Sequence, residues 1–172
     1  SLFIHPALYW IPAGLPFLGL GETLFYSDFP VTKLSTMQAG LGLNWKDRLA
    51  RSMKARSENV ERLCRRLGWS CPCGEDKKTL SLLRFPVLLK TGKDKKAICD
   101  LARKDGLGIT PMYPSPINEI REIKDQFTGM TYPVAKLVAE KLVTLPTHAY
   151  LTNRDIDRIA HVLSVTQCPI VL

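Results

Sequence analysis

The stretch TLPTHAYLTNRDIDRIAHVL, residues 144–163, constrains the fold of this chain more than any other segment. Its first residues favour a strand, which we expect to end at Pro146 because proline cannot donate a hydrogen bond to a sheet. Thr152 is a good N-cap, and Asp155 completes a capping-box-like pair near the positive end of a helix. Apolar residues then recur at helical spacing: Ile156, Ile159, Ala160 and Leu163. The stretch predicts a strand, a short turn and an amphipathic helix.

Comparable signals predict the order of the remaining elements. The region 30–68 reads as one long helix, or as two helices broken near GLGLN, and Gly68 is a natural stop. Pro86 inside the strand predicted at 80–90 indicates an edge or bulged strand. Further elements follow in this order: a helix at 92–106 with Ala97, Ile98, Leu101 and Ala102 inward, a brief strand at 107–110, a proline-rich loop at 111–119 and a helix at 132–143. This order predicts an α/β (α+β) fold: a small two-layer domain whose short mixed or antiparallel sheet has helices on one face.

The net charge of +8 is unusual for a chain whose composition is otherwise typical of soluble globular proteins. Much of it comes from residues 46–67, which contain eight basic and three acidic residues, a surplus of five positive charges. This surplus leaves open a non-catalytic module that contacts nucleic acid or an anionic membrane surface. However, the basic residues have little aromatic interleaving, and no known nucleic-acid-binding motif is visible, so we expect no specific nucleic-acid partner.

The five cysteines are an odd number, and no secretory signal precedes them, so we expect reduced thiols and a cytoplasmic protein. The CPCG sequence lacks the C-x₂₋₄-C spacing and the second ligand pair of zinc sites, so we expect no metal. The segment 2–21 is apolar but interrupted by Pro6, Pro12 and Pro16, which argues against a transmembrane helix. It would instead pack against a partner subunit, a missing domain or a membrane surface. We divide the chain into an apolar leader (1–29), entry helices (30–68) and a small α/β domain (69–172).

Four segments in order resemble the carboxy-terminal part of the DegT/StrS-type sugar aminotransferases. They are KLSTMQAGLGLNWKDRL, RFPVLLK, ARKDGLGITPMYP and YPVAKLVAEKLVTLPTHAYLTNRDIDRI. The last is the most specific, because it keeps the family's (F/Y)P, L-P-x-H and L-T-x-x-D patterns in register. The likeness covers roughly residues 30–165 and has no counterpart for the leader.

The resemblance implies the small domain of a pyridoxal-phosphate enzyme of the aspartate-aminotransferase fold type. The parent would transfer an amino group to a nucleotide-linked keto-sugar, with glutamate as the expected donor. The family's large domain supplies the Schiff-base lysine and most cofactor contacts, and none of that pattern appears here. We therefore expect a missing amino-terminal large domain, a homodimer formed through the parent, no catalytic residue in this chain and no pyridoxal phosphate held by it alone.

Some residues depart from the family pattern. Val31 falls where an asparagine resembles a ligand of the cofactor phosphate, and Thr110 and Met112 replace an arginine and a histidine expected near the acidic group of the substrate. Lys33 keeps a cation and is our candidate cofactor-binding residue, since anions bind well near helix starts. Tyr113 survives and is our candidate substrate-binding residue.

The three histidines are the remaining candidates for acid–base chemistry, because imidazole titrates near neutral pH. His148 follows the strand-ending proline, a place where histidine often only bonds to the backbone, and we favour that structural role. His161 falls among the apolar positions of the last helix and is expected to be structural. His5 lies in the leader and supports no firm inference.

Overall fold

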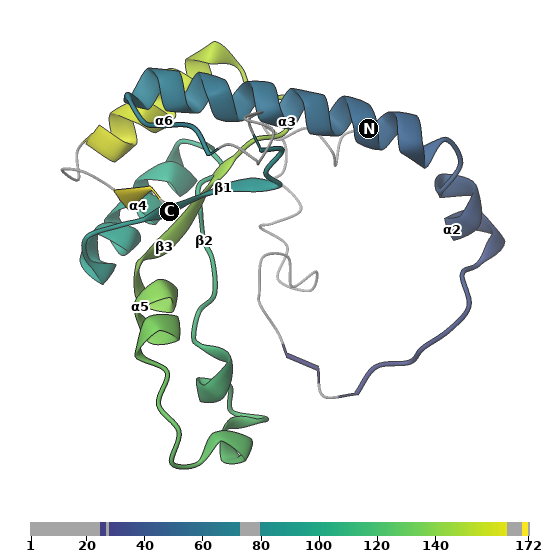
Figure 1. The fold of residues 1–172 in the computed structure, drawn as a ribbon, viewed down its shortest axis with the longest axis vertical. Coiled ribbons are helices and arrows are strands. Elements are labelled where there is room, and N and C mark those ends of the chain that lie inside the picture. The colour runs from purple at the N-terminus through teal and green to yellow at the C-terminus, as the bar shows by residue number, and fades with distance from the viewer. Residues whose placement is uncertain (1–24, 27, 73–79, 165–169, 172) are drawn as a thin grey trace.

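The computed structural model describes residues 25–26, 28–72, 80–164 and 170–171 (Figure 1). The predictions for the leader, including His5, and those for Cys73 and Cys168 lie outside these residues. The described elements are, in chain order, α2 (Thr36–Leu41), α3 (Trp45–Leu67), β1 (Arg84–Leu88), α4 (Gly92–Lys104), β2 (Thr110–Pro111), the 3₁₀ helices η3 (Ile117–Glu119) and η4 (Lys124–Phe127), α5 (Pro133–Lys141), β3 (Leu142–Pro146), α6 (Asn153–Ser164) and β4 (Ile170–Val171). The division into 1–29, 30–68 and 69–172 stays a prediction.

The strands form one sheet in the order β2-β3-β1-β4, and every described pairing is antiparallel. The strand that contains Pro86 is therefore an inner strand, and it pairs with β3 residue by residue without a bulge, so the prediction of an edge or bulged strand was wrong. The amide of Leu89 donates to the carbonyl of Lys141. Because the N–H groups of successive residues in a strand point to opposite sides, the nitrogen of Pro86, three positions earlier, points away from β3. On that other side, the described part of β4 pairs only with Val87 and Leu88. The proline therefore removes no hydrogen bond from either described pairing.

Helices α3, α4 and α6 cover one face of this sheet, and the core lies between them and the strands (Figure 1). Alternate residues of β1 are buried, whereas all five residues of β3 are buried. The two-layer α/β fold with helices on one face is thus confirmed. The core combines residues of α3 (Val60, Leu63, Cys64), β1 and its end (Phe85, Val87, Leu89), α4 (Ile98, Cys99, Ala102), the turn before β2 (Leu107, Ile109), β3 (Val143, Leu145) and α6 with its approach (Leu151, Ile156, Ile159, Val162, Leu163).

The helix ends follow their sequence signals. The amide of Asp155 donates to Thr152 Oγ1 at 3.2 Å, and the amide of Thr152 donates to the Asp155 carboxylate at 3.0 Å, so the predicted capping box is present. A second capping box joins Thr91 and Asp94 at the start of α4. Gly68 ends α3 at a φ of 68°, a conformation that glycine adopts without steric cost.

One open alternative is settled, and two expectations need correction. The chain breaks between α2 and α3, where Asn44 has a φ of 55°, so the two-helix alternative holds. In α4, Ala97 and Leu101 are exposed, because only the face formed by Ile98, Cys99 and Ala102 meets the core. The strand expected at 107–110 begins only at Thr110, since Gly108 has a φ of 68° and turns the chain immediately before it.

Candidate functional site

The two residues predicted to bind cofactor and substrate lie on separate segments. Lys33 is exposed in the extended segment before α2. Tyr113 follows β2 and is 57% exposed. No hydrogen bond or ion pair joins them within the described part of the chain, so these residues do not form a shared site by themselves.

Tyr113 has a φ of 54°, which is uncommon for a bulky residue and strains the backbone. The ammonium group of Lys95 holds the preceding residue, since its Nζ donates to the carbonyl of Met112 at 3.2 Å and to the carbonyl of Ala139 at 2.6 Å. Burial lowers the pKa of Lys95, while the nearby thiol of Cys99 opposes this shift. The lysine ties the Tyr113 loop to the end of α5 and fixes the direction in which the chain leaves β2.

The start of β1 carries a guanidinium that the sequence reading did not single out. Arg84 Nε donates to Thr144 Oγ1 at 2.6 Å, and its Nη2 donates to the carbonyls of Thr144, at 3.0 Å, and of Gly108. The hydroxyl of Thr144 also lies 3.1 Å from that of Thr110. The guanidinium therefore spans β1, β3 and the turn before β2, on the sheet face opposite the helices.

A second arginine reaches the same end of β1 from the middle of α3. Arg56 Nη1 donates to the carbonyl of Leu83 at 2.5 Å and to Thr147 Oγ1 at 3.0 Å, and its Nε donates to Ser52 Oγ at 3.3 Å. Leu83 directly precedes Arg84, so Arg56 is anchored at the start of β1, whereas the Arg84 guanidinium is anchored on Thr144 and Gly108. Burial, reinforced by the charge of Arg56, lowers the pKa of Arg84.

The charges of both arginines act on His148, which directly follows the Thr147 that Arg56 contacts. Burial lowers its pKa, and Arg56 and Arg84 lower it further, whereas Asp155 acts in the opposite direction. Its Nδ1 is buried and has no hydrogen-bond partner among the described residues. Asn59 fixes the backbone here, because its Nδ2 donates to the carbonyls of Thr147 at 3.2 Å and of His148 at 2.8 Å.

The sequence reading missed Arg56, Arg84, Asn59 and Thr147. A usable signal existed for Arg84, since it is a charged residue two positions before Pro86 in a strand whose alternate positions are apolar. The others could not be found, because their partners lie 27 to 91 residues away in the chain. His161 is exposed on α6 rather than placed among its apolar positions.

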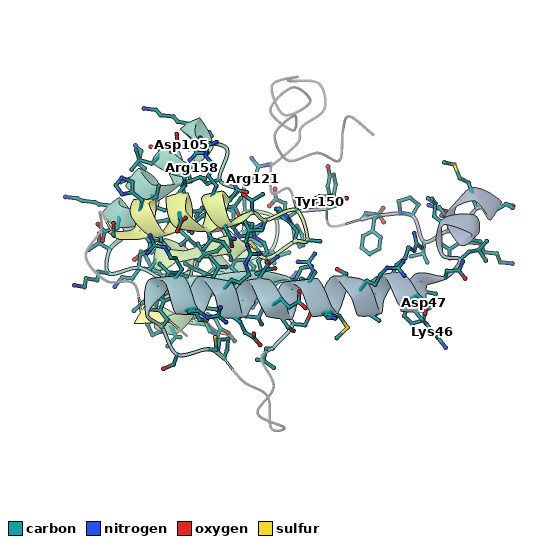
Figure 2. The ribbon with its side chains drawn as sticks, turned by 90° about the horizontal axis from the view of Figure 1, so that it is seen from above. Lys46, Asp47, Asp105, Arg121, Tyr150 and Arg158 are labelled. Atoms are coloured by element: carbon teal, nitrogen blue, oxygen red, sulfur yellow. The ribbon has the colours of Figure 1, made fainter. Side chains whose placement is uncertain are left out.

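The first half of α3 and the segment before it leave large apolar side chains in solvent. We call this set the exposed apolar surface; its members are between 47% and 76% exposed, and they are Leu34, Met37, Leu41, Leu43, Trp45, Leu49 and Met53. Figure 2 shows Lys46 and Asp47 at the end of α3 that projects beyond the body holding Asp105 and Arg158. Exposed apolar side chains gathered in this way differ from the single ones scattered over most protein surfaces, and they are typical of contact sites.

Neither a metal site nor a membrane-spanning helix is found in the described residues. No cluster of three or more His, Cys, Asp or Glu side chains there could hold a metal ion. None of the helices in the described ranges combines the length and apolar character that crossing a membrane requires.

Comparison with known proteins identifies the class. The model of the DegT/DnrJ/EryC1/StrS aminotransferase family matches residues 30–164. The chain therefore belongs to the DegT/DnrJ/EryC1/StrS aminotransferase family. No curated protein sequence matches it.

Several solved structures share its fold. Spr1654 from Streptococcus pneumoniae in its PMP-form is 22% identical with a TM-score of 0.62, and the match covers 78% of this chain and 38% of that protein. PseC of Helicobacter pylori, an aminotransferase involved in the biosynthesis of pseudoaminic acid, is 21% identical with a TM-score of 0.63, covering 85% and 43%. A DegT DnrJ EryC1 StrS aminotransferase from Brucella abortus is 20% identical with a TM-score of 0.63, covering 94% and 44%. The chain thus spans less than half the length of these proteins.

Proposed function

We propose that this chain is the small-domain part of a pyridoxal-phosphate-dependent aminotransferase that acts on a keto-sugar linked to a nucleotide. Family membership over residues 30–164 supports an aminotransferase. The H. pylori protein, an aminotransferase involved in the biosynthesis of pseudoaminic acid, supports a sugar substrate. The match covers only 38% to 44% of the solved proteins described above, so the rest of such an enzyme has room for a large catalytic domain.

The exposed apolar surface is the single observation of this chain that carries the proposal. Burying a leucine or methionine side chain contributes about 1.5–3 kcal/mol, so an isolated domain gains nothing from leaving such side chains in water. In the proposed parent, a large domain or the second subunit of a homodimer would cover this surface. The helix α3 would then link the two domains, with its second half in the core described above.

The cofactor belongs to the parent rather than to this chain alone. When bound, pyridoxal phosphate carries the amino group between the two half-reactions and stabilises the carbanion formed on the substrate. The described residues do not form a site that fits it: Val31 and Lys33 stand on an exposed extended segment, and Lys95 is held by two carbonyls. In the assembled parent, Lys33 would meet an anionic group of the cofactor and Tyr113 would face the substrate.

The test is to express the chain together with the coding sequence upstream of Ser1 and to add pyridoxal phosphate. We expect the visible absorbance of a protein-bound cofactor and amino transfer from glutamate to a nucleotide-linked keto-sugar, whereas the 172-residue chain alone should show neither. An upstream sequence without a cofactor-binding lysine, or no bound cofactor in the longer protein, would contradict the proposal. We further expect the reaction to take place in the cytoplasm.

The alternative, a basic module for nucleic acid or an anionic membrane surface, gains little from the structure. Arg56, Arg62 and Arg66, three of the basic residues of α3, donate to groups of β1, β3, α6 or their adjoining loops. Less of the basic surplus is therefore available to a partner than the sequence suggests. Binding to random DNA or to anionic vesicles that weakens steeply with salt would support the module instead.

A further inference from the structure

The two arginines at the start of β1 retain hydrogen-bond donors that the described protein does not use. A guanidinium has five N–H groups. Arg84 uses Nε and Nη2, and Arg56 uses Nε and Nη1, so the two N–H groups of Arg84 Nη1 and the two of Arg56 Nη2 have no partner among the described residues. Four donors on two anchored cations are therefore left over.

The charge of this pair is not balanced either. Every acceptor that the two side chains contact is a hydroxyl or a carbonyl oxygen, and neither arginine is in an ion pair within the described residues. The carboxylate of Asp155, which acts on the neighbouring His148, already accepts hydrogen bonds from Thr152. Two like charges held near each other and partly withdrawn from water repel, and an anion removes that repulsion.

The geometry is also rigid and accessible. Arg56 is fixed by α3, and Arg84 is fixed by hydrogen bonds to Thr144 and Gly108 across the sheet, so little side-chain entropy remains to be lost on binding. Leu83, whose carbonyl accepts from Arg56, is 74% exposed, and both arginines are only half-buried. A small ligand can therefore reach the pair from solvent.

We propose that Arg56 and Arg84 form a binding site for an oxyanion of the parent enzyme's substrates, either the carboxylate of the amino-acid donor or the diphosphate of the sugar nucleotide. The assignment to these substrates rests on the proposed function. Paired guanidinium N–H groups match the oxygens of a carboxylate or a phosphoryl group, and such charge-assisted bonds are stronger than neutral ones. His148, whose pKa both arginines lower, directly follows the Thr147 that holds Arg56.

The experiment uses the 172-residue chain and two probes, inorganic pyrophosphate and L-glutamate, at an ionic strength held constant with sodium chloride. Backbone amide NMR shifts should change in a saturable way, and the changes should concentrate around Arg84, Gly108, Thr144 and His148. Saturation with pyrophosphate identifies the diphosphate as the source of the anion, and saturation with glutamate identifies the amino donor. Without saturation by either probe, the proposal fails, and the arginines would instead face a carboxylate elsewhere in the parent.

Variants separate a built site from general positive charge. Arg56→Gln and Arg84→Gln should each weaken binding by roughly tenfold or more, as expected for the loss of a charge-assisted hydrogen bond. Arg65→Gln removes the same charge from an exposed position of the same helix and should change the affinity by less than about twofold. If Arg84→Gln disturbs the sheet, Arg56→Lys keeps the charge without the paired donors and should still weaken binding. An equal loss in Arg65→Gln would overturn the proposal.

This result is independent of catalysis by the parent. Anion binding by the chain with no cofactor bound by the longer protein would leave the site standing and remove the proposed function. Cofactor binding and amino transfer by the longer protein, with no anion bound at the arginines, would support the proposed function and contradict the anion site.

Discussion

Replacing Asn59 by alanine should destabilise the fold more than any other polar substitution on α3. The side chain is 4% exposed, and its Nδ2 donates to two backbone carbonyls that follow β3. The carbonyl of Thr147 has no other donor among the described residues, whereas that of His148 keeps the amide of Leu151 at 3.1 Å. One buried carbonyl is thus left unsatisfied, which costs about 1–3 kcal/mol, and a second hydrogen bond worth about 1 kcal/mol is lost. We expect the free energy of unfolding to fall by about 2–4 kcal/mol.

Urea unfolding followed by circular dichroism measures this difference. The matched control is Asn118→Ala, because this half-buried asparagine makes no side-chain hydrogen bond within the described residues. The control should change the free energy of unfolding by less than about 0.5 kcal/mol. A loss of under about 1 kcal/mol in Asn59→Ala would show that the two carbonyls find water or another donor, and would refute the reasoning.

Three further predictions concern His148, the N-cap of α6 and the two halves of α3. The pKa of His148 is lowered in the folded chain, so the unfolded state takes up the proton at a higher pH than the folded state does. The free energy of unfolding should therefore fall as the pH drops below about 6.5 and level off below the folded pKa. In His148→Gln, urea midpoints measured across this pH range should lack this part of the fall. Thr152→Ala removes the N-cap of α6 and should cost about 1 kcal/mol in thermal unfolding, whereas serine at this position should restore most of it; an unaffected melting temperature would argue against the capping box. Leu63→Ala should lower the free energy of unfolding by about 2–5 kcal/mol because the side chain is fully buried. Leu49→Ala, at a side chain that is 47% exposed, should be nearly neutral in this chain and destabilising in the longer protein. Equal losses for the two variants in the chain alone would contradict the view that the first half of α3 has no partner there.

Local signals were sufficient for much of the fold. The capping residues Thr152 and Asp155, the stop at Gly68 and the end of β3 at Pro146 are set by backbone groups within a few residues, so the sequence states them directly. The two-layer arrangement followed from the order of these elements.

Long-range pairing was harder to predict. Pro86 was taken to mark an edge strand, but the rule concerns only the direction of its nitrogen, and β4 comes from the far end of the chain. The arginine pair was missed for a related reason: Arg56 and Arg84 are 28 positions apart, and only tertiary packing of α3 on the end of β1 brings them together. Lys33 and Tyr113 were selected through the family resemblance, and their roles stay proposals.

The continuity of α3 has a mechanical consequence. With 23 residues and a rise of about 1.5 Å per residue, the helix is a rod of roughly 34 Å without an internal proline or glycine. Its last turns pack in the core through Val60, Leu63 and Cys64, so a tilt of the helix at Trp45 would move the α/β body with it. Bending is then concentrated at Gly42–Asn44, the short joint between α2 and α3 in which Asn44 is left-handed.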